Sequence, residues 1–103
     1  MDNDGTKTLN DLIKLFEERK FEELIPLCEK YLRGDSSNAI VWNLLALSHK
    51  NLGNINQAKA MYEKLLVDNP NNPVLLSNLG NLYRSIGRLR DSVNCYIKAL
   101  DND

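Results

Sequence analysis

A repeat of 34 residues is the feature of the sequence that most constrains the fold. Leu24, Ala58 and Ser92 stand 34 residues apart, and the segments around them superimpose without gaps. The same offset links three further sets: Arg19, Gly53 and Gly87; Cys28, Tyr62 and Tyr96; and Tyr31, Leu65 and Ala99. Such a period is typical of repeat proteins, in which each unit buries its apolar face only by stacking on a neighbour. The period therefore predicts a short array of similar structural units.

The middle unit shows which kind of repeat this is. It begins with Trp42, Leu45, Ala46 and His49 on the spacing W-x2-L-G-x2-Y, with alanine for glycine and histidine for tyrosine. It continues with Ala58, Tyr62 and Pro70 on the spacing A-x3-F…P. Both patterns resemble the tetratricopeptide repeat (TPR) family.

The resemblance extends over nearly the whole chain. The units span approximately 5–38, 39–72 and 73–103 and form one domain, 1–103. The third unit carries Leu76, Leu79, Gly80 and Tyr83 on the same spacing. The first is degenerate, as terminal repeats often are: Leu12 and Leu15 replace the small residue and the tyrosine, and Ser36 replaces the proline. The resemblance implies an all-α fold, a right-handed α-α superhelix of three helix-turn-helix units.

Apolar periodicity supports the same fold. Leu9, Leu12, Ile13 and Phe16 recur at the spacing of an amphipathic helix. Gly53 and Gly87 follow predicted helix ends, where a left-handed backbone is wanted, and Pro70 and Pro73 cannot continue the helix before them. Pro26 destabilises the second predicted helix little if that helix begins near Glu22. If the helix begins earlier, Pro26 is expected to kink it. The predicted helices are 7–18, 22–33, 39–51, 55–67, 73–85 and 89–101.

The sequence contains no catalytic constellation. His49 is the only histidine, at a position where the family places a packing tyrosine, so we expect it to pack. Cys28 and Cys95 form no CxxC pair, and we expect both to be buried free thiols. No glycine-rich phosphate loop occurs. We therefore expect no enzyme, no metal and no cofactor. The aromatic residues Trp42, Tyr62, Tyr83 and Tyr96 could form a platform for nucleic-acid bases, but the family pattern predicts core packing for each.

Charge and hydropathy narrow the partners. A formal net charge of −1 gives no broad attraction to nucleic acid or an anionic membrane. No apolar run approaches the roughly 18 residues of a membrane span, and the acidic start is unlike a signal peptide. We expect a cytoplasmic protein with a protein or peptide partner. The third unit is locally basic, through Arg84, Arg88, Arg90 and Lys98, which favours acidic peptides.

The resemblance implies where a partner binds. In stacked helix pairs the first helix of each pair lines a concave groove. The residues of these helices not used for packing are the predicted peptide-binding set: Asn43, Leu47, Lys50, Ser77, Asn78, Asn81 and Arg84. Asparagine amides pair with peptide backbone, and Lys50 and Arg84 with carboxylates. The alternative is that these are ordinary surface residues.

Two family comparisons sharpen the prediction. The positions where chaperone-binding TPR domains hold a carboxylate are occupied by Leu9, Ile13, Leu44, Val74 and Asn78, so that clamp is absent. The run from Ser77 to Asn81 looks like the repeats of O-GlcNAc transferase, and the N-terminal half resembles bacterial TPR regions that precede a transferase domain. An alternative function is therefore substrate docking for a larger glycosyltransferase or sulfotransferase.

The C-terminal helix lacks the polar capping helix that TPR arrays generally need. Val93, Tyr96, Ile97 and Leu100 would face a missing neighbour. Either the sequence is the front of a longer protein, which we favour, or these residues mediate self-association as a homodimer.

Overall fold

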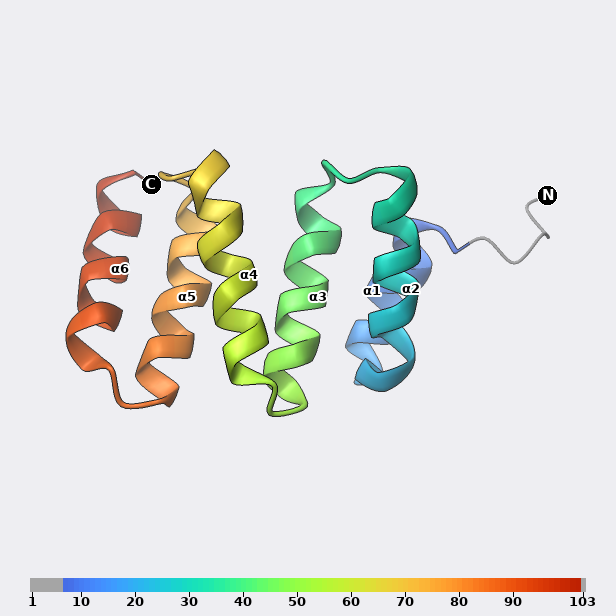
Figure 1. Ribbon diagram of the computed structural model, residues 1–103, viewed down its shortest axis with the longest axis horizontal. Helices are drawn as coiled ribbons and strands as arrows, with labels where there is room; N and C mark the ends of the chain where they lie inside the picture. The colour runs from blue at the N-terminus through green and yellow to red at the C-terminus, as the bar shows by residue number, and fades with distance from the viewer. Residues whose placement is uncertain (1–6, 103) are drawn as a thin grey trace. The chain divides into compact units, whose positions relative to one another are not determined.

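The computed structural model describes residues 7–102, which form six successive α-helices (Figure 1). Their bounds are α1 Leu9–Glu17, α2 Phe21–Gly34, α3 Ala39–Asn51, α4 Ile55–Asp68, α5 Pro73–Ser85 and α6 Leu89–Asp101. The predicted all-α fold is confirmed, and every predicted helix end lies within two residues of the observed one. No helix in residues 7–102 has the length and apolar character that crossing a membrane requires.

The helices divide into two compact units. One contains α1, α2 and α3 and ends at Asn54, and the other begins at Ile55 and contains α4, α5 and α6. The boundary falls inside the predicted second repeat, 39–72. The division of residues 1–103 into three repeats of one domain stays a prediction.

In the first unit, α3 packs against both α1 and α2. Its core is built from fully or almost fully buried side chains, which are Leu12, Leu24, Cys28, Leu32, Val41 and Leu45. Helix α1 begins with a capping box, in which the backbone N–H of Asp11 donates to Thr8 Oγ1 (3.2 Å) and that of Thr8 donates to Asp11 Oδ2 (3.0 Å). The backbone N–H and the hydroxyl of Thr8 both donate to the Asp11 carboxylate, and these bonds to its charged form lower the pKa of Asp11.

In the second unit, α5 packs against both α4 and α6, and the α5–α6 packing is the more extensive. Gly80 permits this close approach, since a Cβ atom there would lie 2.8 Å from Cε1 of Tyr96. The Tyr83 hydroxyl donates to Glu63 Oε2 on α4 (3.0 Å). The guanidinium of Arg88 lies 4.8 Å from the centre of the Tyr83 ring. Tyr83 therefore joins α4 to the turn before α6.

The turns within the helix pairs use a left-handed residue, as predicted for Gly53 and Gly87. Their φ angles are 86° and 83°, and Arg19 has the same role in the first pair with φ 60°. After each glycine the chain bonds back to the preceding helix: Asn54 N–H donates to the His49 carbonyl (2.8 Å), and Arg88 N–H to that of Tyr83 (2.9 Å). Such bonds are the Schellman-type ending of a helix.

Two of the three prolines lie at helix boundaries, and the third lies inside a helix. Helix α4 ends before Pro70, and Pro73 is the first residue of α5, where its missing N–H has no intrahelical partner to lose. Asn72 caps α5, since its Oδ1 accepts from the N–H groups of Val74 (3.0 Å) and Leu75 (3.1 Å). Helix α2 begins at Phe21, one residue before the start expected for it, so Pro26 lies inside the helix and gives the Glu22 carbonyl no donor.

Candidate functional site

The single histidine has a structural environment. His49 is buried on α3, and its Nδ1 lies 3.1 Å from the Nδ2 amide group of Asn54, which can donate to it. Asn54 also donates its backbone N–H to the His49 carbonyl. The two contacts fix the ring beside the turn that ends α3, the packing role expected from the sequence. Among residues 7–102, histidine, cysteine, aspartate and glutamate side chains form no group of three or more that could hold a metal ion.

The two cysteines differ in burial. Cys28 is fully buried in α2, and burial raises the pKa of its thiol to about 12, with a further contribution from Glu29. Cys95 on α6 is only half-buried, so the expectation that both are buried is wrong for this residue. Partial burial and Asp91 still raise the pKa of Cys95. A raised pKa keeps a thiol neutral, and a neutral thiol is a poor nucleophile.

The four aromatic residues also divide into two groups. Tyr62 and Tyr83 are buried, as predicted. Trp42 and Tyr96 are only half-buried, because each directs its polar group outward to a hydrogen bond. Trp42 Nε1 donates to the Ser36 carbonyl (2.7 Å), and the Tyr96 hydroxyl donates to Asn81 Oδ1. An aromatic side chain with a polar group commonly combines packing with such a bond.

On α3, the predicted peptide-binding residues share one face. Asn43, Leu47 and Lys50 recur at i, i+4 and i+7, and all three are half-buried. Asn43 already takes part in an interaction within the protein. The neighbouring Asn51 donates its side-chain amide to the Leu47 carbonyl (2.8 Å), so its amide is used within its own helix.

On α5, Ser77, Asn78, Asn81 and Arg84 likewise share a face. Ser77 and Asn78 are half-buried, whereas Asn81 and Arg84 are exposed. Asn78, like Asn43, already has an interaction within the protein. Because Asn81 Oδ1 accepts from Tyr96, its Nδ2 group is the part that an external ligand could use.

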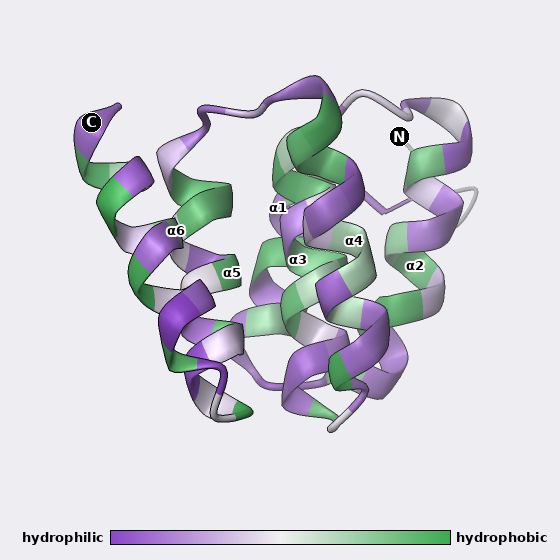
Figure 2. Cartoon of the chain, turned by 60° about the vertical axis from the view of Figure 1, so that its left-hand side comes forward, coloured by the Kyte–Doolittle hydropathy of each residue, from purple (hydrophilic) through white to green (hydrophobic). Residues whose placement is uncertain are grey.

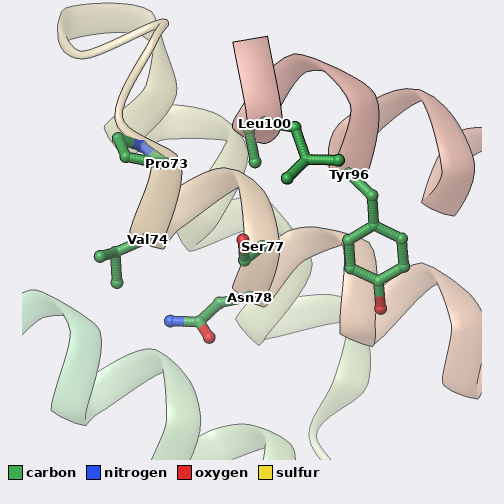
Figure 3. Close-up of a pocket in the computed structure, with 7 residues that line it drawn as sticks. Pro73, Val74, Ser77, Asn78, Tyr96 and Leu100 are labelled. Atoms are coloured by element: carbon green, nitrogen blue, oxygen red, sulfur yellow. The ribbon is translucent and has the colours of Figure 1, made fainter. Parts of the chain in front are cut away.

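Ser77 and Asn78, but not Asn81 or Arg84, line a hollow between α5 and α6 with a volume of about 560 Å³. Its lining residues are Pro73, Val74, Ser77, Asn78, Tyr96, Ala99 and Leu100. Figure 3 shows Pro73 and Val74 on one side, Tyr96 and Leu100 on the other, and Ser77 between them. Ser77 and Asn78 belong to the predicted peptide-binding set, and Tyr96 and Leu100 belong to the predicted self-association set. Within the second unit the structure brings these two sets together around one hollow.

The basic residues of the second unit are not equivalent. Arg88 is paired with Asp91, with its Nη2 2.7 Å from Oδ2, and it also stacks on Tyr83. It is therefore part of the turn between α5 and α6. Arg84, Arg90 and Lys98 are exposed and take part in none of the ion pairs found within residues 7–102. These three cations carry the positive charge that the sequence analysis assigned to this region.

The outer face of α6 carries an apolar stripe. The exposed fractions are 61% for Leu89, 52% for Val93, 53% for Ile97 and 73% for Leu100. Figure 2 shows hydrophobic residues recurring along α6 between hydrophilic ones. Leu89 was absent from the predicted set, although its position four residues before Val93 would have revealed it. Tyr96, which was in that set, turns instead toward Asn81.

Comparison with known proteins agrees with this architecture. The tetratricopeptide repeat family matches residues 39–67 and residues 61–94, which together make up more than half of the chain. No curated protein matches the sequence significantly.

Solved structures of MamA share the fold. MamA AMB-1 is 22% identical with a TM-score of 0.78, over 90% of this chain and 55% of that chain. MamA MSR-1 is 20% identical with a TM-score of 0.80, over 91% of this chain and 54% of that chain. The chain thus spans about half the length of these proteins. With the repeat spacing, the six helices and the family matches, these likenesses lead to one conclusion: the chain belongs to the tetratricopeptide repeat family.

Proposed function

We propose that the chain is a non-catalytic scaffold that holds a segment of another protein on the first helices of its repeats, α3 and α5. Repeat arrays of this kind generally present extended binding surfaces rather than catalytic sites. The observation that carries the proposal is the hollow between α5 and α6, which is apolar inside and continues into polar residues along α5. A narrower alternative, a docking region of a larger transferase, stays a prediction.

The chemistry of the hollow indicates what it would hold. Val74, Tyr96 and Leu100 offer apolar surface to a side chain of a partner. The Ser77 hydroxyl and the Nδ2 group of Asn81 can bond to the backbone of an extended peptide. One turn beyond Asn81, the exposed guanidinium of Arg84 can pair with a carboxylate. The expected ligand is a segment with an apolar residue and an acidic residue a few positions away.

Helix α3 carries a similar sequence of groups in the first unit. Leu47 lies between the amide of Asn43 and the ammonium of Lys50, one helical turn from each. An amide, an apolar side chain and a cation on one helix face are again suited to a peptide with apolar and acidic residues. The two faces therefore favour the same class of ligand.

The test begins with peptides selected against the protein from a random 12-residue display library. The variant Asn81→Ala/Arg84→Ala removes one neutral and one charged hydrogen-bonding group. Together such groups contribute about 2–4 kcal/mol when they bind a ligand, so we expect the dissociation constant to rise at least tenfold. Fluorescence anisotropy of labelled peptides gives the affinity. Unchanged affinity would show that the α5 face is not the binding site.

Two controls separate recognition from folding. Asn56→Ala/Arg33→Ala makes the same chemical changes at exposed positions on α4 and α2 and should leave binding within twofold. Tyr96→Phe removes the hydrogen bond to Asn81 but keeps the Asn81 amide. If Tyr96→Phe weakens binding as much as the double alanine variant, the loss reflects the α5–α6 packing rather than contacts with the peptide.

A further inference from the structure

The two end residues of the apolar stripe on α6, Leu89 and Leu100, occupy repeat positions that are covered elsewhere in the protein. Phe21 and Leu32 on α2 stand two repeat periods before Leu89 and Leu100. Both are only 6% exposed, in a unit where α3 packs against α2, whereas Leu89 and Leu100 are 61% and 73% exposed. Leu89 and Leu100 thus stand where another helix covers the equivalent residues of α2, and Val93 and Ile97 extend the exposed apolar surface between them.

A head-to-tail arrangement would place α1 of a second copy on this stripe. At the register of Val41 and Leu45, which are buried on α3, the first repeat has Lys7, just before α1, and Asp11 in the first turn of α1. Both Lys7 and Asp11 are exposed and charged. Burying these charged groups against leucine and valine carries a desolvation cost that an apolar residue at the same register does not have. Helix α1 is therefore not the occupant.

Helix α6 of a second copy fits the stripe. In an antiparallel pair related by a two-fold axis, Leu89 meets Leu100 of the partner copy and Val93 meets Ile97 of the partner copy. Arg90 and Asp101 lie in the first and last turns of α6, on the same flank of the stripe. The antiparallel pairing brings Arg90 of one copy to Asp101 of the other, twice in each dimer. A parallel pairing places neither residue near an opposite charge.

We propose that the chain forms a two-fold symmetric homodimer through antiparallel pairing of α6 helices. The core of the interface is the stripe of Leu89, Val93, Ile97 and Leu100, and its rim is the pair Arg90–Asp101, present twice. Such closed, self-complementary pairing is the commonest form of homo-oligomer. One helix from each copy buries less than the roughly 1,200–2,000 Å² of a standard interface, so we expect a weak dimer, with a dissociation constant at or above the micromolar end of the range that standard interfaces cover.

The test is sedimentation equilibrium of the whole chain between about 1 and 500 μM, a range that brackets the dissociation constant expected from the interface size. The mass should rise from the 11.8 kDa of one chain toward twice that value. Val93→Glu/Ile97→Glu should raise the dissociation constant more than tenfold. The matched control, Ala60→Glu/Val67→Glu, adds the same charges at exposed positions on α4 and should dimerise normally. A monomer at every concentration, or a dimer that survives Val93→Glu/Ile97→Glu, overturns the proposal.

Charge reversal tests the antiparallel geometry. Arg90→Glu alone and Asp101→Arg alone each place like charges together at both ends of the interface, so each variant should dimerise more weakly. Mixing the two variants restores opposite charges at both ends, and the mixture should form heterodimers with near-native affinity. If the mixture stays as weak as its components, the two helices do not pair antiparallel. Peptide binding by the monomeric variants is a separate measurement, so this proposal and the proposed function can fail independently.

Discussion

The helix pairs α1/α2 and α5/α6 occupy equivalent positions two repeat periods apart, yet they distribute their core volume in opposite ways. In α1/α2 the large residue is on the first helix, as Leu12, and the small one is on the second, as Cys28; both are fully buried. In α5/α6 the first helix has Gly80 and the second has Tyr96, in direct proximity. Both pairs thus combine a larger and a smaller residue at these two positions, which indicates that the repeat constrains their combined volume more than the type of either.

The pairs also differ in what covers them. Helix α3 packs on α1/α2, whereas the apolar stripe on α6 is exposed. Leu32 and Leu100 have the same side chain at the same register, but their exposed fractions are 6% and 73%. The framework sequence of a repeat therefore predicts an apolar helix face, and the presence of the next helix decides whether that face is buried.

The largest expected effect is the difference in stability between alanine substitutions at Leu32 and at Leu100. Leu32→Ala should lower the free energy of unfolding by about 2–4 kcal/mol, because it removes buried methyl groups and leaves a cavity. Leu100→Ala should lower it by less than about 0.5 kcal/mol, since the side chain is already mostly in water. Urea denaturation followed by circular dichroism at 1–2 μM, where the proposed dimer is dissociated on the interface-size estimate, measures both. Equal losses would show that the outer face of α6 is covered even in the monomer.

The second effect concerns the close approach of α5 and α6. Gly80→Ala places a Cβ atom 2.8 Å from Cε1 of Tyr96 and 3.3 Å from Cβ of Cys95, so the Tyr96 ring or the helices must shift. Overpacking typically costs about 1–3 kcal/mol, and the higher helix propensity of alanine offsets about 1 kcal/mol, leaving a net loss of about 0–2 kcal/mol in the free energy of unfolding.

Two variants test whether Tyr96 is the cause. In a Tyr96→Ala background, Gly80→Ala should be neutral or stabilising, because the ring that it meets has been removed. Gly34→Ala, at the end of α2, meets no atom within 4 Å and should stabilise by about 0.4–1 kcal/mol. If Gly80→Ala costs the same with and without the Tyr96 ring, the clash lies with Cys95 instead.

The fold could be predicted from the sequence because several independent signals agree. The 34-residue period, the glycines after helix ends and the prolines between helices each mark the same boundaries, within two residues. Arg19 is the exception. It adopts the left-handed conformation of Gly53 and Gly87, but arginine is not a residue type that predicts this conformation. Only the alignment of the three repeats places it there.

The candidate site was less predictable, because it depends on contacts between helices. Helical periodicity placed Ser77, Asn78, Asn81 and Arg84 on one face, but it could not show that Tyr96 donates to Asn81. It also could not separate Arg88, which pairs with Asp91 and stacks on Tyr83, from the exposed Arg84. Charge counts treat these two arginines alike, whereas side-chain packing makes one structural and leaves the other for a ligand.

The third effect is a dependence of stability on pH in the first unit. The folded-state pKa of Cys28, about 12, lies above the ordinary thiol pKa of 9.0. Between these values the unfolded chain loses the thiol proton while the folded protein keeps it. Stability is therefore full below pH 9 and falls as the pH rises toward 12, by at most about 1.4 kcal/mol per pH unit for one group.

Urea denaturation at pH 8.0, 8.5 and 9.0 measures this slope at pH values where tyrosine hydroxyls, with an ordinary pKa of 10.0, are still mostly protonated in the unfolded chain. Cys28→Ala should flatten the slope, whatever its effect on stability at pH 8. Cys95→Ala should change it less, since Cys95 is half-buried and the burial that raises its pKa is smaller. A slope unchanged by Cys28→Ala would mean that the thiol is accessible to water in the folded protein.

The smallest effect contrasts the turns of the two pairs, where Gly87 and Arg19 share a left-handed backbone. Gly87→Ala should lower the free energy of unfolding by about 1 kcal/mol, because a Cβ atom is strained at φ 83° although the space around it is open.

Arg19→Gly relieves a similar strain, but it also raises the conformational entropy of the unfolded chain and removes the stacking of the guanidinium on Phe21 at 5.2 Å. These opposing contributions are each about 0.5–1 kcal/mol, so stability should change by less than about 0.5 kcal/mol. Arg19→Lys keeps the strain and the charge but loses the planar stacking, and should be less stable than Arg19→Gly. If Arg19→Gly instead stabilises by more than 1 kcal/mol, the contact with Phe21 does not compensate the left-handed turn, and the first pair carries strain that the glycine in the last pair avoids.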